Sequence, residues 1–192
     1  MRLEPDGKWL SFTAEQWLAV RETAFCWHAR VKMAPFVTAV VEDAYEAGHG
    51  RLDAQLWGAV TLAHGEGPAV DRGEIQRYLA EVPWNPGALL HNPELRFEER
   101  PDGAVRVYTR ERTLYVDLFF NAAGDVVRTF CANRPYREEG LRAWEGHFAA
   151  YEELGGLRVP TRGEVTWLLT EGPFTYWRGE VISLRQADDA SG

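Results

Sequence analysis

The sequence predicts a mostly-β protein: an antiparallel sheet of about ten to eleven strands that curls into an unclosed β-barrel around one helical segment, about residues 68–92. Apolar and polar residues alternate along many segments, as they do in strands with one buried face. Gly, Asn, Asp and Pro stand between these segments in short turns, so consecutive strands are expected to be antiparallel neighbours. A sheet of this width has to curl, and the single helical pattern is therefore expected to fill its concavity.

The alternation also places the strands in order. Residues 23–33 are the clearest case, because their odd-numbered positions, among them Phe25 and Trp27, form an apolar face. The predicted strands span residues 13–20, 23–33, 36–46, 50–60, 94–100, 104–110, 112–120, 124–132, 144–153, 157–170 and 173–185. Turn residues such as Gly48, Gly103 and Gly124 separate them.

The helical segment begins with a capping-box pattern. Asp71 is followed three residues later by Glu74, and an apolar face at helical spacing then runs to Pro83. A second short turn is expected from Asn85, with residues 88–90 turned inward. No linker divides the chain, so residues 1–192 are predicted to form a single domain with a polar C-terminal tail at 186–192.

Composition excludes several classes of protein. The 192 residues carry a net charge of -8 and no basic run, which disfavours nucleic acid as a partner. Cys26 and Cys131 are too few for a disulfide framework or a four-cysteine zinc site, although one bridge between them is left open. The five histidines are scattered, and no cofactor-binding motif is present, so neither a metal nor a cofactor is expected.

The sequence shows no recognisable targeting segment. No apolar stretch has the length of a signal peptide or a transmembrane segment. If Met1 is the natural start, the expected location is the cytoplasm.

Three charged side chains are candidates for a polar site. Asp43 has the parity of the apolar positions in its strand, and a buried carboxylate needs a partner, for which Arg77 on the helix is suited. Arg178 shares parity with Phe174 and Tyr176 and is expected to point inward. Each could serve an internal ion pair or a ligand, and Glu74 could act as a helix cap or address a ligand.

Aromatic residues are abundant, with 8 Trp, 7 Tyr and 9 Phe. They either fill the core of a wide curled sheet or line a pocket for an apolar ligand. In the binding interpretation the cavity is lined by Trp27, Tyr78, Trp84, Trp167 and Tyr176, and its polar end is set by Asp43, Arg77 and Arg178.

Several sequence strings resemble a family of uncharacterised bacterial proteins. They are WLSFTAEQ at 9–16, FCWHAR at 25–30, DAYEAGHG at 43–50, GEIQRYLAE at 73–81 with WNP at 84–86, GGLRVP at 155–160 and FTYWRG at 174–179. The resemblance covers nearly the whole chain. It implies a β-meander similar to the fold of the periplasmic outer-membrane lipoprotein carriers, an unclosed barrel whose hydrophobic concavity holds acyl chains under helices.

The function predicted from these observations is non-enzymatic binding of a lipid-like, hydrophobic or amphipathic ligand. One alternative is an enzyme that uses Asp43 or Glu74 with His28 as its acid–base partner. Another is a structural or interaction module that forms a homodimer through an exposed sheet edge or face.

Overall fold

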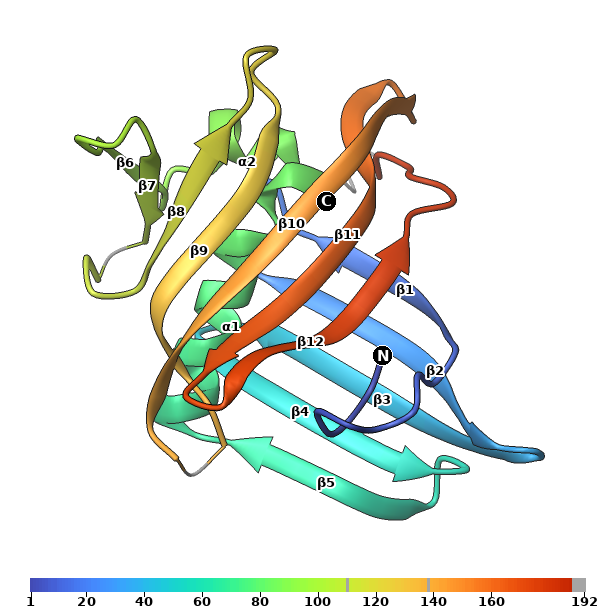
Figure 1. The fold of residues 1–192 in the computed structure, drawn as a ribbon. Helices are drawn as coiled ribbons and strands as arrows, with labels where there is room; N and C mark the ends of the chain where they lie inside the picture. The colour runs from blue at the N-terminus through green and yellow to red at the C-terminus, as the bar shows by residue number, and fades with distance from the viewer. Residues whose placement is uncertain (110, 138, 188–192) are drawn as a thin grey trace.

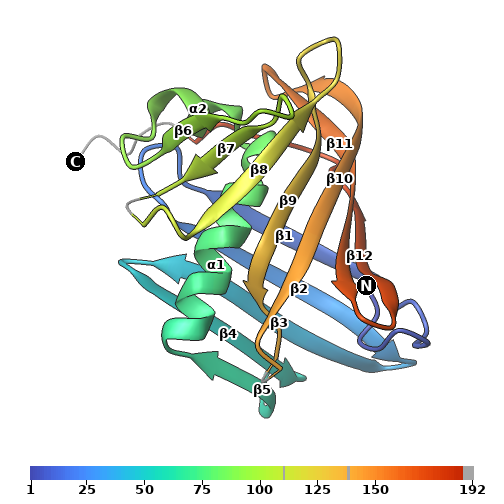
Figure 2. The same cartoon turned by 60° about the vertical axis from the view of Figure 1, so that its left-hand side comes forward.

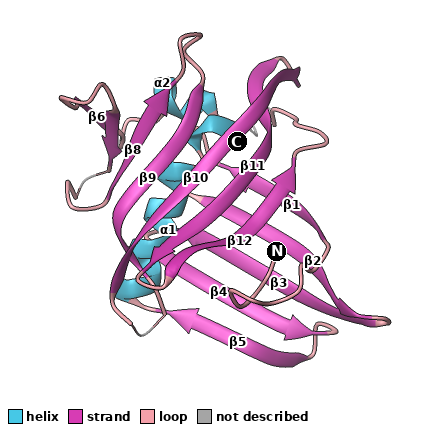
Figure 3. Cartoon of the chain, in the orientation of Figure 1, coloured by secondary structure: helices cyan, strands magenta, loops and turns pink. Residues whose placement is uncertain are grey.

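The computed structural model describes residues 1–187 except 110 and 138. Residues 188–192 of the predicted tail therefore lie outside the described residues. Two antiparallel sheets, with helices between them, make up the described chain (Figures 1 and 3). Neither sheet closes on itself, which confirms the predicted mostly-β, unclosed architecture.

Both sheets are meanders in which each strand pairs with the next. Sheet A contains β1 (Phe12–Leu18), β2 (Phe25–Ala34), β3 (Val37–Glu46), β4 (His49–Leu56) and β5 (Val60–Glu66). Sheet B contains β6 (Arg96–Glu99), β7 (Val105–Tyr108), β8 (Tyr115–Phe120), β9 (Val126–Pro135), β10 (Leu141–Leu154), β11 (Leu157–Leu169) and β12 (Gly172–Glu180).

The helical segment divides the meander. It consists of α1 (Pro68–Ala80), the short 3-10 helix η1 (Val82–Trp84) and α2 (Pro86–His91). Helix α1 packs against β3, β4 and β5 on one side and against β8 and β9 on the other (Figure 2). The expected single curled sheet is therefore split in two between β5 and β6, because the helices occupy the place where the next strand would continue the ladder.

The hydrophobic core lies between the two sheets and around α1. Sheet A contributes Phe25 and Trp27, α1 contributes Tyr78 and Leu79, and sheet B contributes residues such as Trp144, all at most 6 % exposed. The apolar parity of residues 23–33 is thus the buried face of β2, as predicted.

The start of α1 corrects the predicted capping box. The helix begins at Pro68 after Gly67, because proline suits the first helical position, where its missing N–H has no partner to lose. Asp71 lies in the first turn, and its Oδ1 accepts a hydrogen bond from the Gly50 backbone amide of β4 at 2.6 Å. Glu74 is buried within the helix instead of capping it.

Three smaller differences concern element ends. The predicted strand 50–60 ends at Leu56, and a turn at Trp57 and Gly58 leads into β5, a strand that was not predicted. The last strand ends at Glu180 and not at residue 185. Leu90, expected to point inward, is 80 % exposed, whereas Ala88 is buried and Leu89 packs against the core as expected.

Candidate functional site

A group of charged side chains lies inside the protein, against the face of α1 that meets sheet A. Asp43 on β3 stands opposite Trp27 on β2, so both side chains point into the interior. Arg77 of α1 forms an ion pair with Asp43, and its Nε donates to Glu81 Oε1 at 2.8 Å. The guanidinium also lies over the rings of Phe25 and Trp27, 4.9 and 5.2 Å from their centroids. The predicted pairing of Asp43 with Arg77 is confirmed.

Glu74 joins this group as a buried carboxyl. Its side chain lies one helical turn before Arg77 and is 7 % exposed. Burial, reinforced by the Asp43 carboxylate, raises the pKa of Glu74 to about 8, although Arg134 and Arg77 act in the opposite direction. Neither Glu74 Oε2 nor Asp43 Oδ1 accepts a hydrogen bond from a donor among the described residues. A proton held by Glu74 and shared with Asp43 satisfies both oxygens.

Sheet B supplies the second cation. Arg134 on β9 is 8 % exposed and lies over the rings of Trp144 and Trp167, 4.5 and 5.7 Å from their centroids. Burial opposes the charge on Arg77, but the carboxylates of Glu81, Asp43 and Glu74 outweigh it and raise the Arg77 pKa overall. We call Asp43, Glu74, Arg77, Glu81 and Arg134 the buried charge cluster. It is electrically neutral when Glu74 holds its proton.

Aromatic side chains surround the sheet B side of this cluster. Trp167 lies between Tyr136 and Tyr176, at centroid distances of 4.7 and 6.2 Å. The Tyr176 hydroxyl accepts a hydrogen bond from Trp144 Nε1 at 3.2 Å, and burial raises its pKa. The predicted residues Trp27, Trp167 and Tyr176 are therefore brought together around the cluster, each packed against other rings.

Trp84, the last residue of η1, lies farther along the interior and packs against β11. Its Nε1 donates to the Pro160 carbonyl at 2.9 Å, and its ring contacts Phe148 and Trp177. Gly163 makes this possible, because a Cβ there would lie 2.7 Å from Trp84 Cζ2.

Tyr78 links α1 to two other segments of the chain through hydrogen bonds. It is 1 % exposed, and its hydroxyl donates to the Ala19 carbonyl at 2.7 Å while accepting from Asn92 Nδ2 at 2.9 Å. Burial raises the pKa of Tyr78 to about 12. These bonds tie α1 to the β1–β2 loop and to the segment after α2.

Arg178 does not point inward. A bulge in β12 leaves Tyr176 unmatched, because Val165 pairs with Trp177 while Thr166 pairs with Thr175. The extra residue shifts the alternation, so Trp177 faces the interior and Arg178 faces out. Its side chain is 58 % exposed and bonds to Glu164 at 3.0 Å.

The proposed catalytic partner His28 lies on the wrong face. It is adjacent to Trp27 in β2 and pairs with Glu42, so it points away from the side that carries Asp43. The alternative with His28 as acid–base partner of Asp43 or Glu74 is therefore wrong in this form.

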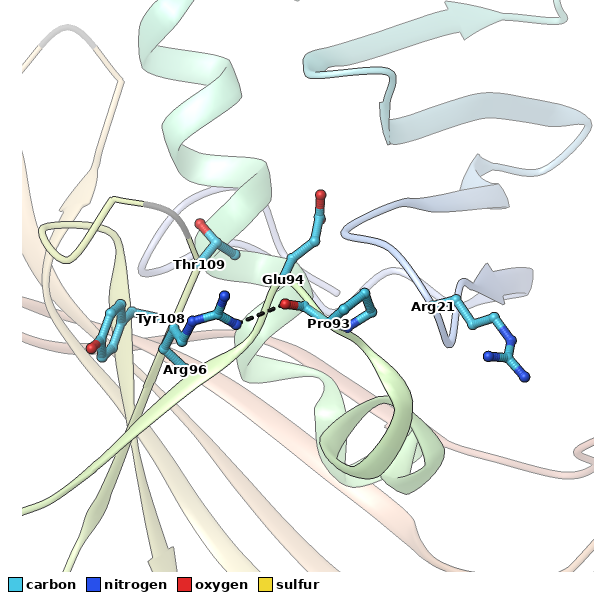
Figure 4. A pocket seen from close by; sticks show the side chains of 6 residues that line it. All are labelled: Arg21, Pro93, Glu94, Arg96, Tyr108 and Thr109. Atoms are coloured by element: carbon cyan, nitrogen blue, oxygen red, sulfur yellow. Dashed lines mark hydrogen bonds between the residues drawn. The ribbon is translucent and has the colours of Figure 1, made fainter.

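Two open pockets lie away from the cluster. One, of about 580 Å³, is formed by Arg21, Pro93, Glu94, Arg96, Tyr108 and Thr109, and Figure 4 shows Arg96 bonded to the Pro93 carbonyl there. The other, of about 640 Å³, runs beside the β2–β3 hairpin. None of the eight predicted ligand-binding residues lines either pocket.

Comparison with known proteins places the chain in a family. A family model described as "Family of unknown function (DUF6544)" matches residues 1–179. The chain belongs to this family. No curated protein matches it. The crystal structure of a LolA superfamily protein from Nitrosomonas europaea is similar at 13 % identity and a TM-score of 0.39, over 97 % of this chain and 90 % of that chain.

Family membership names no chemistry, so the site has to be judged from its own side chains. Glu81 and Arg134 were missed by sequence reasoning. Glu81 could have been found, because it stands four residues after Arg77 on one helix face. Arg134 had no such signal, since a bulge between β9 and β10 breaks the alternation just before it.

Within the described ranges, no helix is long and apolar enough to cross a membrane, and no three His, Cys, Asp or Glu residues gather as metal ligands do.

Proposed function

We propose that this chain is a non-enzymatic binding protein for a hydrophobic or amphipathic, lipid-like molecule, held between sheets A and B beside α1. The observation that carries this proposal is a buried charge cluster beside the rings of Trp27 and Trp144, in which Asp43 Oδ1 and Glu74 Oε2 receive no hydrogen bond from another described residue and share only the proton held by Glu74. Ligand sites for apolar molecules have this composition, with few polar groups that fix orientation.

The way in follows from how the sheets are joined. Every strand pair lies within one sheet, and helix α1 contacts both sheets. At the edges, the rings of Phe12 of β1 and Trp177 of β12 lie 5.8 Å apart. The segment before β1 also bonds to β12, because the Arg2 backbone amide and Nε donate to the carbonyls of Tyr176 and Thr175 at 2.8 and 2.7 Å. Parting these edges about α1 would break these two bonds and expose Trp27 and Trp84, but it would break no strand ladder. The apolar body of a ligand would then replace ring-to-ring contacts.

The polar end selects the head group. Asp43 Oδ1 and Glu74 Oε2 are both acceptors, so a head that donates hydrogen bonds, an amine or a hydroxyl, is favoured over a carboxylate. An ammonium head would take the place of the proton shared by the two carboxyls. Because the pKa of Glu74 is raised to about 8, binding of an amine below that pH releases close to one proton.

A pair of fluorescent probes tests this proposal. A dansyl-labelled alkylamine and a dansyl-labelled alkane of equal chain length are titrated into the purified protein, with native mass spectrometry for co-purified molecules. We expect saturable binding of both probes and tighter binding of the amine. Glu74→Gln, which keeps the shape of the side chain, should weaken binding of the amine probe by about tenfold. It should leave the alkane unchanged.

The matched control is Arg178→Gln, which removes an exposed charge outside the interior. It should alter neither probe. The proposal is overturned if neither probe binds saturably and no small molecule accompanies the native protein.

A further inference from the structure

Sheet A ends in two neighbouring turns that carry exposed aromatic residues. The turns β2–β3 and β4–β5 lie at the same end of the sheet, with β2–β3 extending farthest (Figure 1). Phe36 is 98 % exposed and Trp57 62 %, and Val60 and Leu62 beside them are also exposed. We call these four residues the aromatic tip. Trp57 bonds to the other hairpin through its backbone amide and its Nε1, which donate to the carbonyls of Thr38 and Phe36 at 2.9 and 3.2 Å.

The backbone at both turns is unusual for large side chains. Phe36 has φ 63° and Trp57 has φ 51°, in the left-handed region that glycine and asparagine favour. Pro35 precedes Phe36, as in a type II turn, and Trp57 is followed by Gly58, as in a type I′ hairpin turn. Glycine at either position would cost less in backbone strain, so the turns themselves do not require these rings. Phe36 and Trp57 thus point outward although their left-handed backbone conformation disfavours large side chains.

Charge around the aromatic tip is opposite to that of the whole chain. The protein has a net charge of -8, yet residues 29–41 and 54–65 contain no Asp or Glu. Arg30 and Lys32 are exposed on β2, and neither has a carboxylate within ion-pair distance among the described residues. Both line the pocket of about 640 Å³ beside Phe36.

We propose that the aromatic tip docks on the surface of a bilayer that contains anionic lipid. Aromatic side chains favour the boundary between head groups and acyl chains. Arg30 and Lys32 complement anionic head groups, and the acid-free segments keep the negative remainder of the protein away from the surface. This surface lies outside the interior between the two sheets, and the inference does not depend on the proposed ligand.

Co-sedimentation with vesicles tests the docking. Phosphatidylcholine vesicles are compared with vesicles that also contain phosphatidylglycerol, and the protein is expected to bind mainly the second kind. Phe36→Gly combined with Trp57→Gly should reduce binding by at least about tenfold, since the two rings supply most of the inserted apolar area. Its melting temperature should stay the same or rise, because glycine suits both turns. Leu90→Ser, at another exposed apolar position, is the control and should not change binding.

The charge contribution is measured separately. Arg30→Gln with Lys32→Gln should weaken binding to the anionic vesicles by about thirtyfold. Arg162→Gln, an exposed arginine of sheet B, should not. Trp57→Phe should keep binding but lose the quenching of tryptophan fluorescence by bromine-labelled acyl chains.

Three results would overturn the inference. The first is equal sedimentation of the wild type and the double glycine variant with anionic vesicles. The second is no sedimentation of the wild type. The third is a homodimer in analytical ultracentrifugation that the double glycine variant abolishes while the wild type does not bind vesicles, which would make the tip an interface between two copies.

Discussion

Replacement of Glu74 by Gln should make the protein less sensitive to alkaline pH. Glu74 is 7 % exposed, and its pKa is raised from 4.5 to about 8, with burial as the largest cause. The unfolded chain releases this proton near pH 4.5, whereas the folded chain keeps it until about pH 8. The stabilising contribution is therefore fully present below pH 4.5 and is lost as the pH rises through 8. The whole shift corresponds to roughly 5 kcal/mol.

A narrower window isolates this carboxyl. Between pH 6 and pH 8 the free energy of unfolding of the wild type should fall by roughly 2–3 kcal/mol through Glu74 alone. Glutamine cannot ionise, and its amide can donate to Asp43 Oδ1, so the variant should lack this slope. Other shifted groups lie mainly outside the window: the pKa values of Glu98, Asp125 and Glu145 are lowered, and those of Cys26 and Cys131 are raised above 9. The pKa of His64 is raised and that of the Met1 amine is lowered, but both groups are present in the wild type and the variant, so their contributions to the pH dependence cancel in the comparison.

The assay is urea unfolding at pH 6, 7 and 8, followed by tryptophan fluorescence. Glu171→Gln, in the exposed turn before β12, is the matched control and should follow the wild type. Parallel pH dependences for the wild type and Glu74→Gln would refute the reasoning, because they would show that the Glu74 carboxyl is ionised at little cost when folded.

Three further substitutions test the packing. Gly163→Ala should destabilise the protein by about 1–3 kcal/mol in urea unfolding, because its Cβ would lie 2.7 Å from the Trp84 ring; an unchanged midpoint would mean that the ring moves freely. Arg77→Met should cost about 3–5 kcal/mol by the same assay, since it leaves the buried Asp43 carboxylate without its cation, and stability equal to wild type would contradict the buried pair. Arg178→Gln should change stability by less than about 1 kcal/mol, as expected of an exposed ion pair, and a larger loss would place its side chain inside.

Local patterns were read correctly where a strand has regular neighbours. The parity of β2 and β3 put Trp27 and Asp43 on one buried face, and the helical face of α1 put Arg77 within reach of Asp43. The same rule failed for Arg178, because the bulge in β12 adds one residue and reverses the alternation after it. Bulges depend on the partner strand, which a single segment does not reveal.

The start of α1 shows the same limit. Asp71 and Glu74 have the spacing of a capping box, but the helix is preceded by Gly67, four residues before Asp71, and begins at Pro68. Asp71 then bonds to Gly50 of sheet A, and Glu74 turns toward Asp43. A carboxylate that stabilises a helix end and one buried in a cluster look alike in sequence, and only the packing of the helix on the sheet separates them.

By itself, the sequence determined a mostly-β antiparallel meander, one helical insertion and the pairing of Asp43 with Arg77, because alternation and short turns act over a few residues. The tertiary structure decided that the meander breaks into two sheets with α1 between them. It also brought Arg134 of β9 to the same interior as Glu74 and Arg77, across about 60 residues of chain. Burial of these charges together, and the raised pKa of Glu74, arise from desolvation by both sheets at once, which no local pattern encodes.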